Sequence, residues 1–394
     1  MIRLRPSKFL LRGGEARLFA LLGALAATAA CTAEPAHDLD AVPFVEAVRT
    51  IHTGSFDEGE TAFATVIGLA RTSDGVLHLL QGQAPAVTRI AADGSILDST
   101  GEWGLGPGEY QSPIAIGARG DSVWIVDRGT GRETVYFDGD FVRTARMEAG
   151  GVGFRYFTPL PDGGTLGRLV DTGHDGRESG AFSRVDHLVR VDGDGNVADT
   201  LAVLTTESTT TVRIFRAEGG AVMTVGPSDF PHDQVDERNG DLWIVERPFP
   251  RRSEARVRLV RISPLGDTLA VVRLRKQALP IPDSETAARL SERRAQLLPR
   301  LPWDEVEPYV PRPAYRAPTS DFVVGADGWM WLALEARPEA TDRVWVMLDP
   351  DGAPRYRTRL PAGFAGHAAD RRSIVGVYRD ALDVPAVETY RVEG

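Results

Sequence analysis

Asp-Gly pairs punctuate this chain and separate short runs of β-branched and aromatic residues. Because an Asp-Gly pair readily adopts the positive φ angles of a two-residue hairpin loop, each pair predicts a turn between two antiparallel strands. Short strands that alternate with such turns over most of a chain are typical of an all-β repeat fold. Six of the pairs stand at Asp74-Gly75, Asp93-Gly94, Asp138-Gly139, Asp162-Gly163, Asp327-Gly328 and Asp351-Gly352.

The predicted strands group into repeats of four or five strands. A spacing of about 40 residues or more per repeat matches the four-stranded sheets of a β-propeller. Only two strands, at 373–378 and 387–392, remain at the C-terminus. Since a closed ring leaves no long sheet edge open, we expect residues 45–50 to complete a sixth sheet. The predicted fold is an all-β, six-bladed β-propeller, with its five full repeats at about residues 64–98, 114–147, 154–204, 211–274 and 322–360.

One segment, at about residues 276–318, interrupts the repeat between the fourth and fifth units. Asp283 is a suitable N-cap, and a helix is predicted to run from it to Leu298, ahead of Pro299. The residues that follow are rich in proline and surround Trp303, so they cannot form ladder strands throughout. We expect this helical and proline-rich insertion to cover one mouth of the central channel and to take part in ligand binding.

The N-terminal segment predicts export. Residues 1–30 hold five basic residues, and an apolar run extends from Leu18 to Ala30, which is the order found in secretory signal peptides. A helix needs about 20 apolar residues to span a bilayer, so this run is too short for a transmembrane anchor. Cys31, the only cysteine of the chain, follows directly.

The residues around Cys31 resemble the lipobox of bacterial lipoproteins, in which the cysteine is acylated and becomes the mature N-terminus. Thr28 stands where leucine is usual. The resemblance implies lipidation at Cys31, a lipid-anchor tether over residues 31–41 and a propeller over residues 42–394. An Asp directly after the cysteine would resemble an inner-membrane retention signal, but Thr32 stands at that position. We therefore expect an outer-membrane anchor facing the periplasm. Cleavage without acylation would instead release a soluble periplasmic protein.

Two further motifs point to the same family. The run Gly104-Leu-Gly-Pro-Gly-Glu-Tyr110 lies ahead of the predicted strand Val123-Trp-Ile-Val-Asp127, and this arrangement resembles six-bladed propellers of the NHL-repeat type. Together with the lipobox and Gly376-Val-Tyr-Arg-Asp380, it resembles a family of bacterial six-bladed β-propeller lipoproteins over about residues 42–394. The resemblance implies the fold and the anchor but no particular activity.

Four residues are the candidate ligand contacts: Trp103, Glu109, Arg128 and Trp303. Trp103 and Trp303 lie in predicted loops, Glu109 belongs to the glycine motif, and Arg128 follows the strand at 123–127. We interpret the glycine motif itself as a crossover between blades, with its tyrosine packed between them, rather than as an anion cradle. The tryptophans inside predicted strands are interpreted as blade core: Trp124, Trp243, Trp331 and Trp345.

No catalytic residue, metal site or cofactor is predicted. The sequence lacks a Gly-x-Ser-x-Gly elbow, a phosphate-binding loop and a dinucleotide fingerprint. Six-bladed hydrolases with a channel metal use Glu, Asn and Asp ligands, whereas both asparagines here, Asn196 and Asn239, stand among turn residues. A metal site that includes His232 or His367 stays open as an alternative, but scattered histidines of this kind more often pack between blades or lie at the surface.

The charge balance excludes one class of partner. The formal net charge is −10, and removal of residues 1–30, with five basic residues and Glu15, makes it about −14. Nucleic-acid binding needs a basic footprint, so no nucleic-acid partner is expected.

The interpretation that combines these features is an exported, lipid-anchored binding module. We expect it to take a protein, peptide or small-molecule ligand at one face of the ring, and to touch the membrane through its N-terminal lipid only. The alternative is a periplasmic hydrolase or lyase that uses the central channel. Inward carboxylates and histidines with shifted pKa values would favour the enzyme, whereas an open surface lined by aromatic and arginine side chains would favour the binder.

Overall fold

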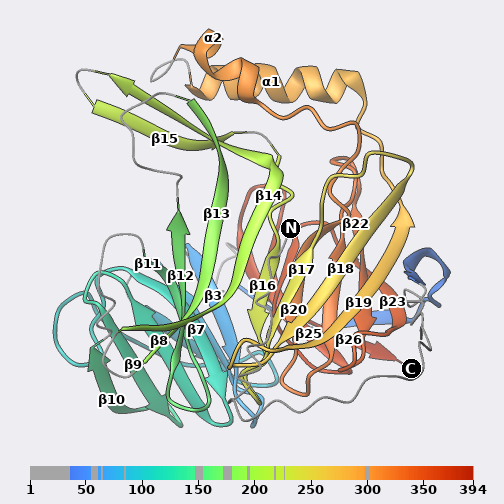
Figure 1. The fold of residues 1–394 in the computed structure, drawn as a ribbon. Helices are drawn as coiled ribbons and strands as arrows, with labels where there is room; N and C mark the ends of the chain where they lie inside the picture. Colours follow the sequence, from blue (N-terminus) through green and yellow to red (C-terminus); the bar gives the residue numbers. More distant parts are fainter. Residues whose placement is uncertain are drawn as a thin grey trace, which may run out of the picture.

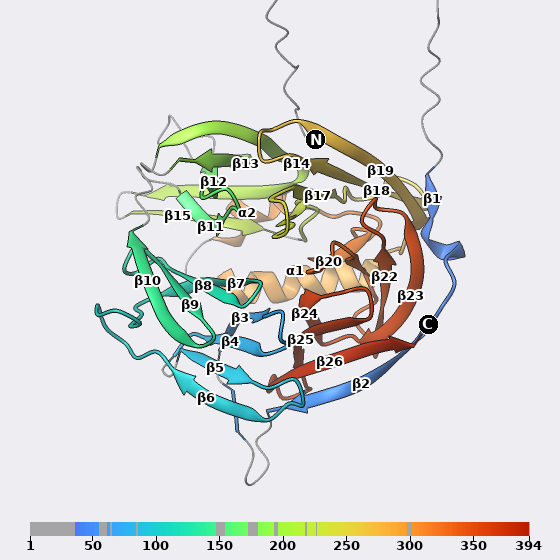
Figure 2. The same ribbon diagram turned by 90° about the horizontal axis from the view of Figure 1, so that it is seen from below.

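The computed structural model describes residues 36–54, 61–63, 65–83, 86–146, 154–171, 180–192, 196–216, 219–225, 227–297 and 302–393. Within these residues, six sheets are arranged radially around a central axis (Figure 1; Figure 2). Each sheet is one blade, whose inner strand lies near the axis and whose outer strand lies at the rim. The predicted six-bladed β-propeller is therefore confirmed.

Blades 1, 2 and 5 follow the predicted repeats closely. Their strands pair in chain order from axis to rim, and the Asp-Gly turns have the predicted positive φ, for example +90° at Gly75 and +81° at Gly328. Blade 1 comprises β3 (Val66–Arg71), β4 (Leu77–Gln81), β5 (Val87–Ile90) and β6 (Ile96–Thr100). Blade 2 comprises β7 (Pro113–Arg119), β8 (Ser122–Asp127), β9 (Arg132–Phe137) and β10 (Asp140–Arg146), and blade 5 comprises β20 (Thr319–Val324), β21 (Met330–Leu334), β22 (Asp342–Leu348) and β23 (Pro354–Pro361).

Blade 3 is larger than predicted. Residues 211–215 and 221–225, expected to open the fourth repeat, instead form the end of β14 and the paired strand β15. That prediction was wrong because the Thr- and Val-rich run 203–213 holds no Gly or Pro that would end the strand. The extended strands rise well above the ring (Figure 1). The blade comprises β11 (Phe154–Pro159), β12 (Thr165–Asp171), β13 (Gly180–Val191), β14 (Val197–Arg216) and β15 (Gly219–Val225).

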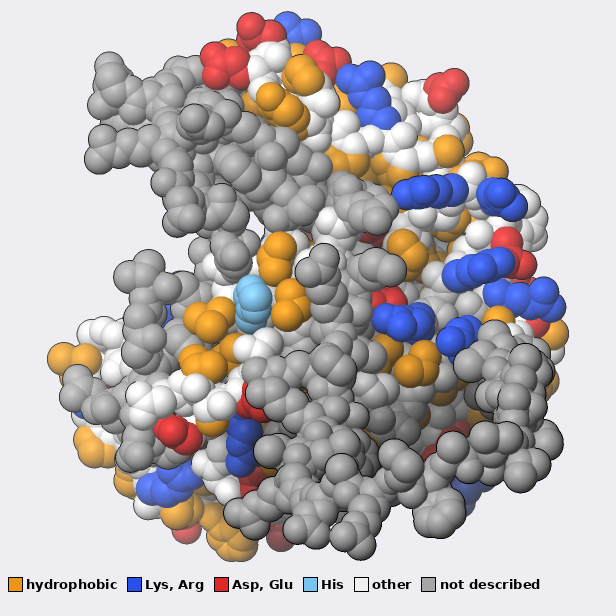
Figure 3. All heavy atoms as spheres, viewed as in Figure 1, with side chains coloured by type: hydrophobic (Ala, Val, Ile, Leu, Met, Phe, Trp, Pro, Cys, Tyr) orange, Lys and Arg blue, Asp and Glu red, His pale blue; other side chains and the backbone are white. Residues whose placement is uncertain are grey.

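Blade 4 opens with a short polar strand that no pattern predicted. This strand, β16 (His232–Val235), reads His-Asp-Gln-Val and lacks the apolar alternation of a half-buried strand. It is followed by β17 (Leu242–Glu246), β18 (Glu254–Ile262) and β19 (Thr268–Gln277). Basic side chains gather over β18 and β19 on the outside of the blade (Figure 3).

Blade 6 is built from both ends of the chain. β2 (Glu46–Thr53) pairs antiparallel with β26 (Pro385–Glu393), which confirms the role predicted for residues 45–50. The rest of the blade is β25 (Ser373–Arg379) and an inner strand, β24 (Phe364–Ala369), that was not predicted. The ring is thereby closed without a covalent link between its ends.

The N-terminal segment also reaches two other blades. β1 (His37–Asp38) pairs in parallel with β19 of blade 4, and Phe44 bridges in parallel to Arg357 of blade 5. Leu39, in the short 3-10 helix η1 (Leu39–Ala41), is fully buried against both blades. Residues 37–41, expected in the tether, thus pack on the propeller because burial of Leu39 holds them there.

Apolar clusters between neighbouring blades form the core. The predicted core tryptophans Trp243, Trp331 and Trp345 are at most 1% exposed, and Trp124 is 8% exposed. One cluster joins blades 4 and 5 through Trp243, and another joins blades 5 and 6 through the two tryptophans of blade 5. Since each cluster draws side chains from two blades, burial of apolar area favours the closed ring over separate sheets.

The insertion lies where it was predicted, between β19 and β20. It contains α1 (Asp283–Leu297), α2 (Trp303–Val306) and the 3-10 helix η2 (Glu307–Tyr309). Its two ends are joined by backbone hydrogen bonds from Ile281 to Ala314 and from Arg316 to Leu279. Helix α1 lies above one face of the ring and crosses its axis (Figure 1; Figure 2). No helix in the described part of the chain is long and apolar enough to cross a membrane.

Candidate functional site

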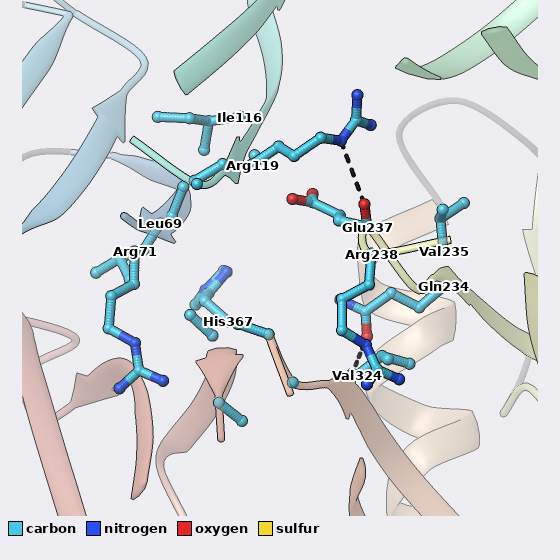
Figure 4. A pocket seen from close by; sticks show the side chains of 18 residues that line it. Leu69, Arg71, Ile116, Arg119, Gln234, Val235, Glu237, Arg238, Val324 and His367 are labelled. Carbon is cyan, nitrogen blue, oxygen red and sulfur yellow. Dashed lines mark hydrogen bonds between the residues drawn. The ribbon is translucent and has the colours of Figure 1, made fainter. Parts of the chain in front are cut away.

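The inner strands enclose a cavity of about 170 Å³ on the axis of the ring. Because a single buried water needs only about 10–15 Å³, this cavity has room for a small organic molecule. Its walls come from β3, β7, β16, β20 and β24 and from the turns that follow them. The polar side chains that line it are Arg71, Arg119, Gln234, Glu237, Arg238 and His367 (Figure 4).

Three arginines line the cavity where the inner strands end, but only two of them are neutralised by a carboxylate. Arg71 donates to Asp370 at 2.7 Å, and Arg238 donates to Asp236 at 2.6 Å. Arg119 instead donates to backbone carbonyls, at 3.2 Å to Glu237 and at 3.0 Å to Pro159. Among the described residues, Arg119 therefore has no ion pair within 4 Å.

Glu237 directs its carboxyl group into the cavity (Figure 4). Burial raises the pKa of Glu237 to about 7, and the negative charge of Asp236 adds to this rise, while Arg119 opposes it. The carboxyl group is thus protonated in part of the molecules at neutral pH. Gly117 provides the space for it, because a Cβ at that position would lie 2.7 Å from Glu237 Oε1 and 2.1 Å from Trp124.

His367 also points into the cavity, from β24 (Figure 4). Burial lowers the pKa of His367 to about 4, so its imidazole is neutral at physiological pH. A neutral imidazole can donate one hydrogen bond and accept another. The cavity therefore combines a cation, a carboxyl group that titrates near neutrality and a neutral imidazole.

Two polar side chains hold the inner strands around this cavity. Gln234 Oε1 of blade 4 accepts from the backbone N–H of Val324 of blade 5 at 2.6 Å. Asp321 of blade 5 accepts from the backbone N–H of Gly366 of blade 6 at 3.0 Å, and burial raises the pKa of this carboxyl group. These bonds link the inner strands of blades 4, 5 and 6.

Three of the predicted ligand contacts lie around the crossover between blades 1 and 2. Trp103 is 46% exposed, and Arg128 is exposed. Glu109 folds back on its own loop and accepts from the backbone N–H of Gly106 at 2.6 Å. Tyr110 is fully buried and hydrogen-bonds Tyr136 at 2.6 Å, as expected for a side chain packed between blades. None of the three lines the axial cavity.

Trp303 and His232 lie elsewhere. Trp303 is only 8% exposed, so it is part of the packing of the insertion and not of an open surface. His232 is partly buried in blade 4, and burial lowers its pKa to about 3. A separate groove of about 510 Å³ lies between the insertion and the propeller, and it is lined by Arg289 and Arg316 of the insertion and by Glu335 of blade 5. The signal segment 1–30 and Cys31 lie outside the described residues.

Sequence reasoning missed the central residues Arg119 and Glu237. For Arg119, a usable signal was its position in the repeat. Arg71 and Arg119 each follow an alanine at the end of an inner strand, just before the first turn of the blade. Alignment of the blades on that turn would have placed both side chains at the same level of the axis. Within the described residues, no group of three or more His, Cys, Asp or Glu side chains is placed to hold a metal ion.

Comparisons with known proteins match the chain to solved propellers of different activities. No protein family model and no curated protein matches it. A virginiamycin B lyase from Staphylococcus aureus is 12% identical with a TM-score of 0.44, and the match covers 88% of this chain and 100% of that chain. An aldose sugar dehydrogenase from Streptomyces coelicolor is 13% identical with a TM-score of 0.40, over 89% and 100% of the two chains. A member of the duf4221 family from Bacteroides vulgatus is 9% identical with a TM-score of 0.39, over 89% and 99%. At these values the likenesses carry no argument about function.

Proposed function

We propose that this protein is an exported, lipid-anchored propeller that binds a small anionic ligand, such as an organic acid, in its central channel. The observation that carries the binding site is Arg119, a channel cation whose described hydrogen bonds go only to carbonyl groups. A carboxylate ligand would supply the missing counter-charge through a charge-assisted hydrogen bond. Export and anchoring rest on the leader 1–30 and on the lipobox-like residues around Cys31.

Glu237 makes the proposed binding depend on pH. When it is protonated, its carboxyl group can donate a hydrogen bond to an anion beside Arg119, whereas the ionised form repels that anion. Because the pKa of Glu237 is about 7, the affinity for an anion falls as the pH rises from about 6 to about 8. A bound anion in turn raises the pKa of Glu237 further, so that binding takes up protons.

Thermal shift with succinate and citrate as probes tests this function. The wild-type melting temperature should rise with probe concentration, since a ligand that binds only the folded state stabilises it, and the rise should be larger at about pH 6 than at about pH 8. Arg119→Gln should lose the rise relative to its own ligand-free value. Arg337→Gln, a change at a 60% exposed arginine outside the cavity, is the matched control. Equal shifts in wild type and Arg119→Gln would contradict the assignment.

A second candidate function is acid–base catalysis in the same cavity, as a hydrolase or lyase. The observation that favours it is a carboxyl group with a pKa of about 7 in one cavity with the neutral imidazole of His367. A general base works best when its pKa lies near the working pH. Glu237→Gln separates the two functions, because a binder keeps its probe affinity at about pH 6, whereas an enzyme loses turnover of any substrate that the wild type converts.

A further inference from the structure

The outer hairpin of blade 4 places arginines directly opposite one another. Arg256 faces Arg275, and Arg258 faces Arg273, across the β18–β19 pair. Like charges opposite each other destabilise a sheet, so this arrangement has no benefit for the isolated blade. With two exposed arginines of the loop before β18, these residues form what we call the arginine face: Arg251, Arg252, Arg256, Arg258, Arg273 and Arg275 (Figure 3).

The arginine face carries a net positive charge on an acidic protein. Glu246 contacts Arg258 at 2.7 Å, Glu254 contacts Arg256 at 2.9 Å, and Asp38 contacts Arg275 at 3.3 Å. These three carboxylates contact Arg256, Arg258 and Arg275, whereas the chain as a whole has a net charge of −10. Arg273 is exposed and has no ion pair within the described part of the chain. Phosphate groups would relieve the repulsion, because guanidinium groups bind phosphate through paired hydrogen bonds.

The N-terminal segment leaves the propeller beside this face. β1 pairs with Leu274 and Arg275 of β19, so the chain that comes from Cys31 reaches the fold at the outer edge of blade 4. Five residues lie between Cys31 and His37, and the six Cα-to-Cα steps from one to the other can span at most about 20 Å. An acyl chain on Cys31 would therefore hold the arginine face close to the membrane.

We propose that the arginine face docks on the anionic phospholipid headgroups of the membrane that carries the anchor. This surface is separate from the channel and goes beyond the ligand-binding function, and its position relative to the membrane rests on the proposed anchor. Docking at the outer edge of blade 4 places the rim of the ring, and not one of its two faces, against the membrane. The channel axis then runs along the membrane plane, and both faces of the ring stay open to the surrounding solution.

Vesicle co-sedimentation of the exported chain with Cys31→Ser, which removes the acylation site, tests the docking surface. The chain should bind vesicles of phosphatidylglycerol mixed with phosphatidylcholine, and not vesicles of phosphatidylcholine alone. Each arginine near an anionic surface strengthens binding about fivefold. Arg256→Gln with Arg273→Gln should therefore weaken binding by about 20-fold or more, and high salt should abolish it. Both side chains are exposed, so circular dichroism and melting should stay those of the parent chain.

The matched control is Arg372→Gln with Arg391→Gln, which removes two exposed arginines from blade 6. This control should bind as the parent chain does. The proposal is overturned if the control and the test variant lose the same affinity, if the test variant loses none, or if the parent chain does not bind anionic vesicles. Each of these results leaves the thermal shift with succinate and citrate unaffected. The proposed docking surface and the proposed channel function can therefore be rejected independently of one another.

Discussion

Burial, rather than ion pairing, sets the protonation states of the channel residues. Glu237 and His367 are shifted in the directions that favour their neutral forms, to pKa values of about 7 and about 4. Low-dielectric surroundings disfavour the charged form of any side chain, which raises the pKa of an acid and lowers that of a base. Arg119 stays charged because a guanidinium group does not deprotonate in proteins. It is thus a cavity-wall cation that has no ion pair within 4 Å among the described residues.

Glu237→Gln should increase stability above neutral pH. Below the ordinary Glu pKa of 4.5, the group is protonated in both the folded and the unfolded chain, and its contribution is fully present. As the pH rises through the folded pKa of about 7, the folded chain must hold a buried charge, and the contribution is lost. The loss amounts to about 3 kcal/mol at most. Urea unfolding at about pH 8 should show the gain for Glu237→Gln.

The same variant should unfold at about pH 5 much as the wild type does, because both then carry a neutral group at this position. Glu339→Gln, at a side chain that is 71% exposed, serves as control and should change neither measurement. An equal gain at both pH values would mean that removal of the carboxyl group acts through packing, and the assigned pKa of Glu237 would be wrong.

Among the elements, the strands with continuous apolar runs were predictable and the inner strands of blades 4 and 6 were not. β17 and β21 hold runs such as Leu-Trp-Ile-Val and Met-Trp-Leu-Ala-Leu, which pack between blades and therefore carry the signal of a buried strand. β16 and β24 read His-Asp-Gln-Val and Phe-Ala-Gly-His-Ala-Ala. Both strands lie near the axis, and their polar and small residues give them no apolar run that marks a strand in the sequence.

The same cause explains the missed site residues. Gln234 and His367 belong to those two unpredicted strands, and Glu237 follows the first of them by two residues. The predicted contacts Trp103 and Trp303 came instead from their position in loops, and a loop sequence does not show which surface a side chain reaches. Trp103 and Trp303 look alike in the sequence, yet one is 46% exposed and the other 8%. The path of the insertion over the ring accounts for the lower exposure of Trp303.

Trp303→Ala should destabilise the insertion, whereas Trp103→Ala should have little effect. Truncation of a buried tryptophan removes about 3 kcal/mol or more of packing free energy, and Trp303 is buried together with Val306 and Val310 of the same segment. Limited proteolysis should show faster cleavage within residues 278–318 for Trp303→Ala. Cleavage of Trp103→Ala should match wild type, and its free energy of unfolding should stay within about 0.5 kcal/mol. Equal resistance of the two variants would indicate that Trp303 does not hold the insertion together.

At the scale of the whole molecule, the N-terminal segment 37–53 pairs with strands of three blades. It contributes a parallel pair to blade 4, a bridge to blade 5 and an outer strand to blade 6. Phe44 also stacks under the guanidinium groups of Arg357 and Arg359, at 4.2 and 4.5 Å from the ring centre. A propeller with an open blade exposes unpaired backbone groups along a strand edge, so this segment protects the ring both from opening and from association with other copies.

A chain that begins at residue 54 should lose cooperative folding, whereas one that begins at residue 36 should unfold as the full chain does. The longer truncation removes β2 and leaves Glu388, which is fully buried, without two of its partners, because Arg49 and His52 each contact its Oε1 at 2.8 Å. Loss of partners for a buried carboxylate is strongly destabilising, and the bare edge of β26 should promote association. Urea unfolding should give a broad transition of low midpoint, and size-exclusion chromatography should show oligomers. Sharp unfolding of this shorter chain as a monomer would mean that the sheets close the ring without β2, against the pairing of β2 with β26.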